Sequence, residues 1–93
     1  MRLTNVEIAA IKQSVYAFDP GAKIYLFGSR VDDAKKGGDI DLFVLSEKIK
    51  NPERRKIKIS LYDKIGEQKI DLVVTPKILK AFHQLAVSSG VEL

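Results

Sequence analysis

The sequence lacks cysteine and tryptophan, and it contains a single histidine, His83, among its 93 residues. Without cysteine the chain can form neither disulfides nor thiolate metal sites, so any metal must be held by oxygen ligands or by that histidine. The same absence fits a reducing compartment, and we predict a cytoplasmic protein. No apolar stretch approaches the roughly 20 residues that a membrane-spanning helix needs, and no apolar segment of a secretion signal follows the N-terminus. We therefore expect no membrane association.

Charge of one sign is also not in large excess. Sixteen basic residues are offset by twelve acidic ones, which leaves a net charge of +4. Residues 53–58 form the one basic cluster, and a solvated helix face explains such a run more simply than RNA does, so direct nucleic-acid binding is not predicted. A hydrophobic content of 45% and a length of 93 residues predict one globular domain over residues 1–93. An enzyme of this size would need its acceptor brought by another molecule.

Apolar periodicity predicts an α/β chain. Thr4 followed by Glu7 makes a capping box, and apolar residues then recur at spacings of three and four, which is typical of an amphipathic helix. Residues 23–27, 40–45 and 70–74 are short runs rich in β-branched and aromatic side chains, and we interpret them as strands. The expected order is helix, strand, strand, helix, strand, helix.

Two further helices follow from their starting residues. Asn51 as N-cap with Pro52 at the first helical position begins one, and Thr75 with Pro76 is expected to begin the last. The last helix should bury an apolar face made of Leu79, Phe82, Leu85 and Ala86. His83 lies on the same helix, is expected to be at the surface or hydrogen-bonded within the helix, and receives no functional role.

The dipeptide Gly28-Ser29 directly follows a predicted strand. A glycine there lets the backbone turn tightly and come close to a phosphate, and the N–H groups of a following helical turn favour negative charge. Ser29 adds a hydroxyl donor and Arg30 a charged one. Taken alone, however, such a dipeptide is more often an ordinary tight turn.

Asp39 and Asp41 begin the second strand. Residues two apart on a strand point to the same face with Cα atoms roughly 6.5 Å apart, so the two carboxylates converge. The opposite face carries the apolar residues Ile40, Leu42 and Val44. Hard oxygen ligands of this kind suit magnesium, although acidic strand ends in contact with solvent are also common.

Asp71 interrupts an apolar run on the third strand. If this strand pairs with the second, the spacing of about 4.8 Å between neighbouring strands places Asp71 next to the other two aspartates. Three carboxylates there could hold two magnesium ions at the roughly 3.5–4 Å separation used in phosphoryl transfer. The alternative is an exposed aspartate at a strand end.

These motifs together resemble a known pattern. The string Leu-Phe-Gly-Ser-Arg at 26–30, the string Asp-Ile-Asp-Leu at 39–42 and the later Asp71 look like the defining motif of the polymerase β superfamily of nucleotidyltransferases. Length, order of elements and the ending Ser-Gly-Val-Glu-Leu at 89–93 are similar to the minimal nucleotidyltransferase (MNT) proteins. The resemblance implies the polymerase β-like fold, a small mixed sheet flanked by helices.

The resemblance also implies site roles. Gly28, Ser29 and Arg30 would bind the nucleotide, with the first two on the triphosphate of ATP or another nucleoside triphosphate. Asp39 and Asp41 would bind magnesium, and Asp71 would complete the metal set and help deprotonate the attacking hydroxyl. The reaction would attach a nucleoside monophosphate to that hydroxyl and release pyrophosphate.

Relatives of this size are commonly encoded beside a helical HEPN protein, often an RNase toxin, and act as its antitoxin, in several cases by adenylylating it. The resemblance therefore implies a HEPN-domain partner as acceptor. The alternative is a binding module that neutralises such a toxin by complex formation, with a weak or vestigial nucleotide site. The oligomeric state is left open.

Overall fold

The chain folds around a four-stranded mixed sheet. A computed structural model describes residues 1–32, 39–66 and 68–93, apart from the side chain of Ser29. The elements are α1 (Asn5–Tyr16), β1 (Lys23–Phe27), the 3-10 helix η1 (Gly28–Val31), β2 (Ile40–Leu45), α2 (Asn51–Ile65), β3 (Ile70–Thr75), α3 (Ala81–Ser89) and β4 (Val91–Glu92). The strand order is β3-β2-β1-β4, and only the β2–β3 pair is parallel. The expected mixed sheet flanked by helices is therefore confirmed.

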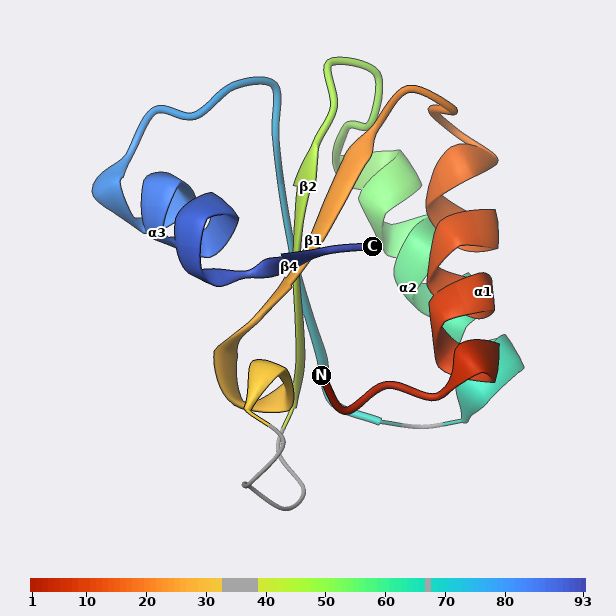
Figure 1. Cartoon of the computed structure of the whole chain (residues 1–93). Coiled ribbons are helices and arrows are strands. Elements are labelled where there is room, and N and C mark those ends of the chain that lie inside the picture. Colours follow the sequence, from red (N-terminus) through yellow and green to blue (C-terminus); the bar gives the residue numbers. More distant parts are fainter. Residues whose placement is uncertain (33–38, 67) are drawn as a thin grey trace.

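The helices cover the two faces of the sheet unequally. Figure 1 shows α1 and α2 side by side on one face and α3 on the other. No helix of the described residues is long and apolar enough to cross a membrane.

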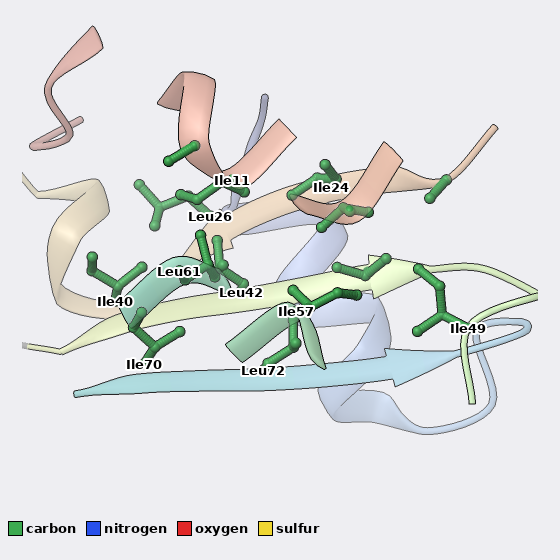
Figure 2. Close-up of a cluster of buried hydrophobic side chains, with 14 residues drawn as sticks. Ile11, Ile24, Leu26, Ile40, Leu42, Ile49, Ile57, Leu61, Ile70 and Leu72 are labelled. Carbon is green, nitrogen blue, oxygen red and sulfur yellow. The ribbon is translucent and has the colours of Figure 1, made fainter. Parts of the chain in front are cut away.

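The main core lies between the sheet and the α1–α2 pair. Ile40, Leu42 and Val44 of β2 are fully buried there, as the alternation of the strand predicts. Ile57 and Leu61 of α2 contribute to the same cluster (Figure 2). Burying a side chain of this size contributes roughly 1.5–3 kcal/mol, so this layer holds β2 in place and fixes which way its other side chains point.

Polar contacts secure the two helices of this layer. The capping box at the start of α1 is confirmed: the Glu7 backbone N–H donates to Thr4 Oγ1 at 3.1 Å and the Thr4 N–H to Glu7 Oε1 at 2.9 Å. Lys50, not Asn51, is the N-cap of α2, because Glu53 accepts a hydrogen bond from the Lys50 N–H at 2.9 Å. That expectation was one residue late.

The start of the last helix was predicted wrongly. Thr75 is the final residue of β3, and its hydroxyl donates to the Lys77 carbonyl at 2.9 Å, so the helix begins only at Ala81. The side chain at its first turn that accepts N–H groups is His83, whose Nδ1 accepts from the backbone of Leu79 at 3.2 Å and Lys80 at 3.3 Å. Of the two expectations for this histidine, the hydrogen-bonded one is confirmed.

The apolar face expected for α3 is also different. Leu79, Phe82 and Leu85 are exposed by 64%, 43% and 61%, while His83 and Ala86 are buried. The buried face is set by Phe43, whose ring centroid lies 5.3 Å from that of His83. An imidazole with its acceptor satisfied can lie against an aromatic ring, and this turns the larger apolar side chains outward.

The strand β4 was not predicted. It follows α3 through Gly90, where an added Cβ would collide with the Ala86 carbonyl oxygen and would lie 2.7 Å from that of Leu26. The close approach lets Val91 pair with Leu26, and the Leu93 N–H then donates to the Ile24 carbonyl at 2.9 Å. A run this short is outside what alternation in the sequence can indicate.

Candidate active site

Two aspartates face each other across the parallel strands. In the register of β2 with β3, Asp41 is opposite Asp71, at the spacing of about 4.8 Å between neighbouring strands. Asp39 directly precedes β2 and is two residues before Asp41, so an extended backbone directs both side chains to one face. This is the α3 face, since Phe43 follows at the next alternate position and packs with Tyr25 and Ala86 there. The expected pairing of the third strand with the second is confirmed.

Negative charge in this cluster is not fully balanced. Partial burial raises the pKa of Asp41 to about 6, and hydrogen bonding to Asp71 together with the negative charges of Asp71 and Asp39 adds to the effect. Lys69 is a nearby cation, with its Nζ 3.3 Å from Asp39 Oδ2. The hydrogen bond and charge of Asp39 chiefly raise the pKa of Lys69. Because this ion pair is exposed to solvent, it leaves the repulsion between Asp41 and Asp71 in place.

The donors present suit a hard divalent cation. Carboxylate oxygens are ligands that magnesium takes in proteins, and a cation would relieve the repulsion that adds to the effect of burial on the pKa of Asp41. Across the described ranges 1–32, 39–66 and 68–93, no three His, Cys, Asp or Glu side chains already converge as a ligand set. The two-ion magnesium set stays a prediction.

Gly28 joins β1 to η1 immediately beside this cluster. Its φ of +77° lies in the left-handed region that favours glycine. A Cβ at this position would also collide with Asp41 Oδ2. The tight turn expected from the sequence is thus present, and its backbone lies against a carboxylate. Ser29 continues it as part of η1, but its side chain lies outside the described part, so its contact with a phosphate stays a prediction.

Arg30 makes hydrogen bonds to other parts of the chain. Its Nη1 donates to the Arg2 carbonyl at 2.9 Å, and its Nη2 donates to Gln68 Oε1 at 3.3 Å. Gln68 in turn donates to Glu7 Oε2 at 3.2 Å. The guanidinium therefore joins η1 to the N-terminal segment and to the residues before β3. A role in nucleotide binding stays a prediction, and it would require these two donors to rearrange.

A family model described as polymerase beta, nucleotidyltransferase, matches residues 10–93. The chain belongs to the polymerase β nucleotidyltransferase family. The superfamily that the motifs resemble is thus confirmed, and with it nucleotidyl transfer as the general class of activity. Domains of this family generally use a nucleoside triphosphate and a divalent metal. No curated protein matches the chain at a significant level.

Two further residues lie beside these aspartates and were not predicted from the sequence. Lys69 could have been found from its spacing, because it lies two residues before Asp71 on an extended segment. Phe27 is the cross-strand partner of Asp41 in β1, and this depends on the register of the antiparallel pair. Phe27, Asp41 and Asp71 thus lie at matching positions of three neighbouring strands, and we call Asp39, Asp41 and Asp71 the carboxylate row.

Proposed function

We propose that this nucleotidyltransferase uses magnesium to transfer a nucleoside monophosphate, with ATP as the expected donor, to a hydroxyl of a partner protein. The observation that carries the proposal is the register that places Asp41 opposite Asp71, with the backbone of Gly28 against the Asp41 carboxylate. Family membership supports the reaction class. The identity of the metal, donor and acceptor is our proposal.

Each residue of the row has a task in this scheme. Asp39, Asp41 and Asp71 would hold the metal, which when bound supplies positive charge against the negative charge that develops on the transferring phosphoryl group. The backbone N–H groups at Gly28 and Ser29 would bind the triphosphate. Asp71, which is exposed, would accept the proton of the attacking hydroxyl as its oxygen bonds to the α-phosphorus and pyrophosphate leaves.

The acceptor in our proposal is a HEPN-domain protein, and the chain would be the antitoxin of a cytoplasmic toxin–antitoxin pair. The similarity of the motifs and length to MNT proteins motivates this choice. A separate acceptor also fits the site itself, because Asp71 and Asp39 are open to solvent at one end of the sheet, where a second protein can reach them.

The proposal is tested by the intact mass of a co-expressed HEPN partner after incubation with ATP and magnesium. The wild-type chain is compared with the double variant Asp39→Asn, Asp41→Asn. A matched control is Asp63→Asn, the same chemical change at an exposed position of α2 outside the row. We expect a gain of one or more nucleoside monophosphates with the wild type and the control, and none with the double variant.

A binding module is the second candidate, and the exposed side chains of Ile78, Leu79 and Leu85 favour it. Apolar groups of this size suit contact with another protein. In that case no mass would be gained, and the double variant would neutralise the toxin as well as the wild type. This result would overturn the transferase proposal.

A further inference from the structure

An apolar pocket borders the Gly28 turn. It has a volume of about 400 Å³ and lies between α3 and the end of β1. Its lining includes Phe27, Gly28, Val31, Phe82, Leu85 and Ser89. Figure 1 shows α3 on the face of the sheet opposite to α1 and α2, which is the face of the carboxylate row.

The lining suits a flat aromatic ligand. The rings of Phe27 and Phe82 lie edge to face, with centroids 5.4 Å apart and an interplanar angle of 78°. Phe82 and Leu85 keep 43% and 61% of their surface exposed, although both are large and apolar. A pocket of about 400 Å³ falls within the range of roughly 300–1,000 Å³ typical of small-molecule sites. A stacked heterocycle would remove this apolar surface from water.

The pocket is continuous with the proposed reaction site. Gly28 lines the pocket and also approaches the Asp41 carboxylate. Phe27 lines it as well and is the cross-strand partner of Asp41. A second pocket, bordered by Asp19, lies at the other end of β1, roughly 16 Å away along the strand. Because Gly28 borders the first pocket, a ligand with its phosphates on the Gly28 turn would have its base beside that pocket.

We propose that this pocket binds the nucleobase of the nucleoside triphosphate, stacked against Phe82 beside Phe27. The inference rests on the proposed function, because it assumes that the triphosphate lies on the Gly28 turn. Asp32 and Ser89 are the polar side chains of the described lining, so base edges meet few hydrogen-bonding groups. The pocket therefore selects by stacking area: purine nucleotides bind more tightly than pyrimidine nucleotides, and adenine is distinguished only weakly from guanine.

The test compares ATP with inorganic tripolyphosphate, which carries the same phosphates without a base. Calorimetry with magnesium is run on the wild type, Phe82→Ala and the matched control Leu79→Ala. Leu79 is exposed, precedes α3 and does not line the pocket. We expect Phe82→Ala to weaken ATP binding roughly tenfold, the loss of one aromatic stacking contact, and to leave tripolyphosphate unchanged. Leu79→Ala should bind both as the wild type does, and Phe82→Trp should restore ATP affinity.

Other outcomes separate the inference from the proposed function. ATP affinity that is unchanged in Phe82→Ala would overturn the nucleobase assignment while leaving triphosphate binding intact. If Phe82→Ala lost binding to the partner protein while its ATP affinity stayed unchanged, the pocket would instead bind a side chain of that partner. Equal weakening of ATP and tripolyphosphate would also overturn it, because the change would then act on the turn. Absence of binding of either ligand to the wild type would overturn both the inference and the proposed function.

Discussion

Asp41 takes part in three features of the site: the register of the strands, the contact with the Gly28 backbone and the repulsion between carboxylates. It is opposite Asp71 in β3 and Phe27 in β1, and its carboxylate lies against Gly28. An aspartate in these surroundings does not stabilise the fold when ionised, since two further carboxylates repel it. Under the proposed function a bound cation would offset this repulsion, so single substitutions at Asp41 should affect stability and activity in opposite directions.

Asp41→Asn should stabilise the metal-free protein near pH 8 by about 1 kcal/mol, after allowance for solvent screening. The native pKa of about 6 exceeds the ordinary value of 3.8, so the native state binds the proton more tightly than the unfolded chain. The contribution of proton binding at Asp41 to the stability of the wild type is therefore fully present below about pH 3.8 and is lost as the pH rises through 6. Urea denaturation in EDTA at pH 8 and pH 4 checks this. An advantage of the variant that persists at pH 4 would argue against the charge explanation.

Gly28→Ala should weaken ATP binding and lower the free energy of unfolding by about 1–2 kcal/mol, the cost of left-handed backbone for a residue with a Cβ. The added Cβ would also displace the Asp41 carboxylate. Gly21→Ala is the matched control, because its Cβ would lie 3.5 Å from Asp19 Oδ1, an ordinary contact. Calorimetry with ATP and urea denaturation measure both effects. Equal behaviour of the two variants would contradict the assigned role of the turn.

At the scale of elements, side chains far apart in the sequence hold helices and strands together. The hydroxyls of Ser14 in α1 and Ser60 in α2 lie 2.9 Å apart. Arg54 Nε donates to the Leu72 carbonyl at 2.8 Å, so this member of the basic cluster binds the outer edge of β3. A paired edge is less prone to associate with other strands. Part of that cluster therefore has a structural role.

The end of the sheet opposite the carboxylates is joined by Asp19 and Ser46. Ser46 Oγ donates to Asp19 Oδ2 at 2.6 Å. Ser46 Oγ also accepts the backbone N–H groups of Lys48 and Ile49 at 3.1 Å each. The hydrogen bond from Ser46 is the main reason that the pKa of Asp19 is lowered. These contacts fix the turn after β2 to the turn before β1.

Ser46→Ala should lower the free energy of unfolding at pH 7 by about 1.5–3 kcal/mol, because it removes the hydroxyl donor from Asp19 Oδ2 and leaves the buried carboxylate with the Gly21 N–H on its other oxygen. The native pKa of Asp19 lies below its ordinary value of 3.8, so this stability is present above that pH and is lost as the pH falls through the native value. The deficit of the variant should shrink at pH 3, as urea denaturation at both pH values would show. Ser88→Ala is the control, since Ser88 is exposed and its hydroxyl donates to the Leu85 carbonyl of the same helix. A deficit independent of pH would point to packing instead.

At the scale of the whole molecule, the two faces of the sheet have different tasks. The α1–α2 face is filled by the main core, and the α3 face carries the carboxylate row and the pocket. Ligands that bind the α3 face can therefore add stability without changing the core. Any ligand that binds only the native state raises the free energy of unfolding in proportion to the logarithm of its concentration.

Magnesium with ATP should raise the free energy of unfolding of the wild type by about 2.7 kcal/mol at a hundred times the Kd. The variant Asp39→Asn, Asp71→Asn should gain little, because two of the proposed ligands are neutral. Thermal melting with potassium chloride at equal ionic strength is the control for charge screening. Equal stabilisation by potassium would show that screening, and not a metal site, accounts for the effect.

Local spacing was enough to predict much of this molecule. The alternation of Ile40 and Leu42 with Asp41 defines the two faces of β2, and the capping box of Thr4 and Glu7 defines the start of α1. Such features depend on residues within one or two turns of one another, and these interact in the same way wherever the element lies. The Gly28 turn and the shared direction of Asp39 and Asp41 belong to this class.

Tertiary structure alone decided the rest. The pairing of Asp41 with Asp71 was a conditional expectation until the parallel register was known. The outward turn of Phe82 and the burial of His83 depend on the position of Phe43, a residue distant in the sequence. The hydrogen bond from Arg30 to the Arg2 carbonyl likewise joins η1 to the N-terminal segment. These outcomes depend on which elements pack against each other. The spacing of residues within one helix or strand carries no information about the element that packs against it.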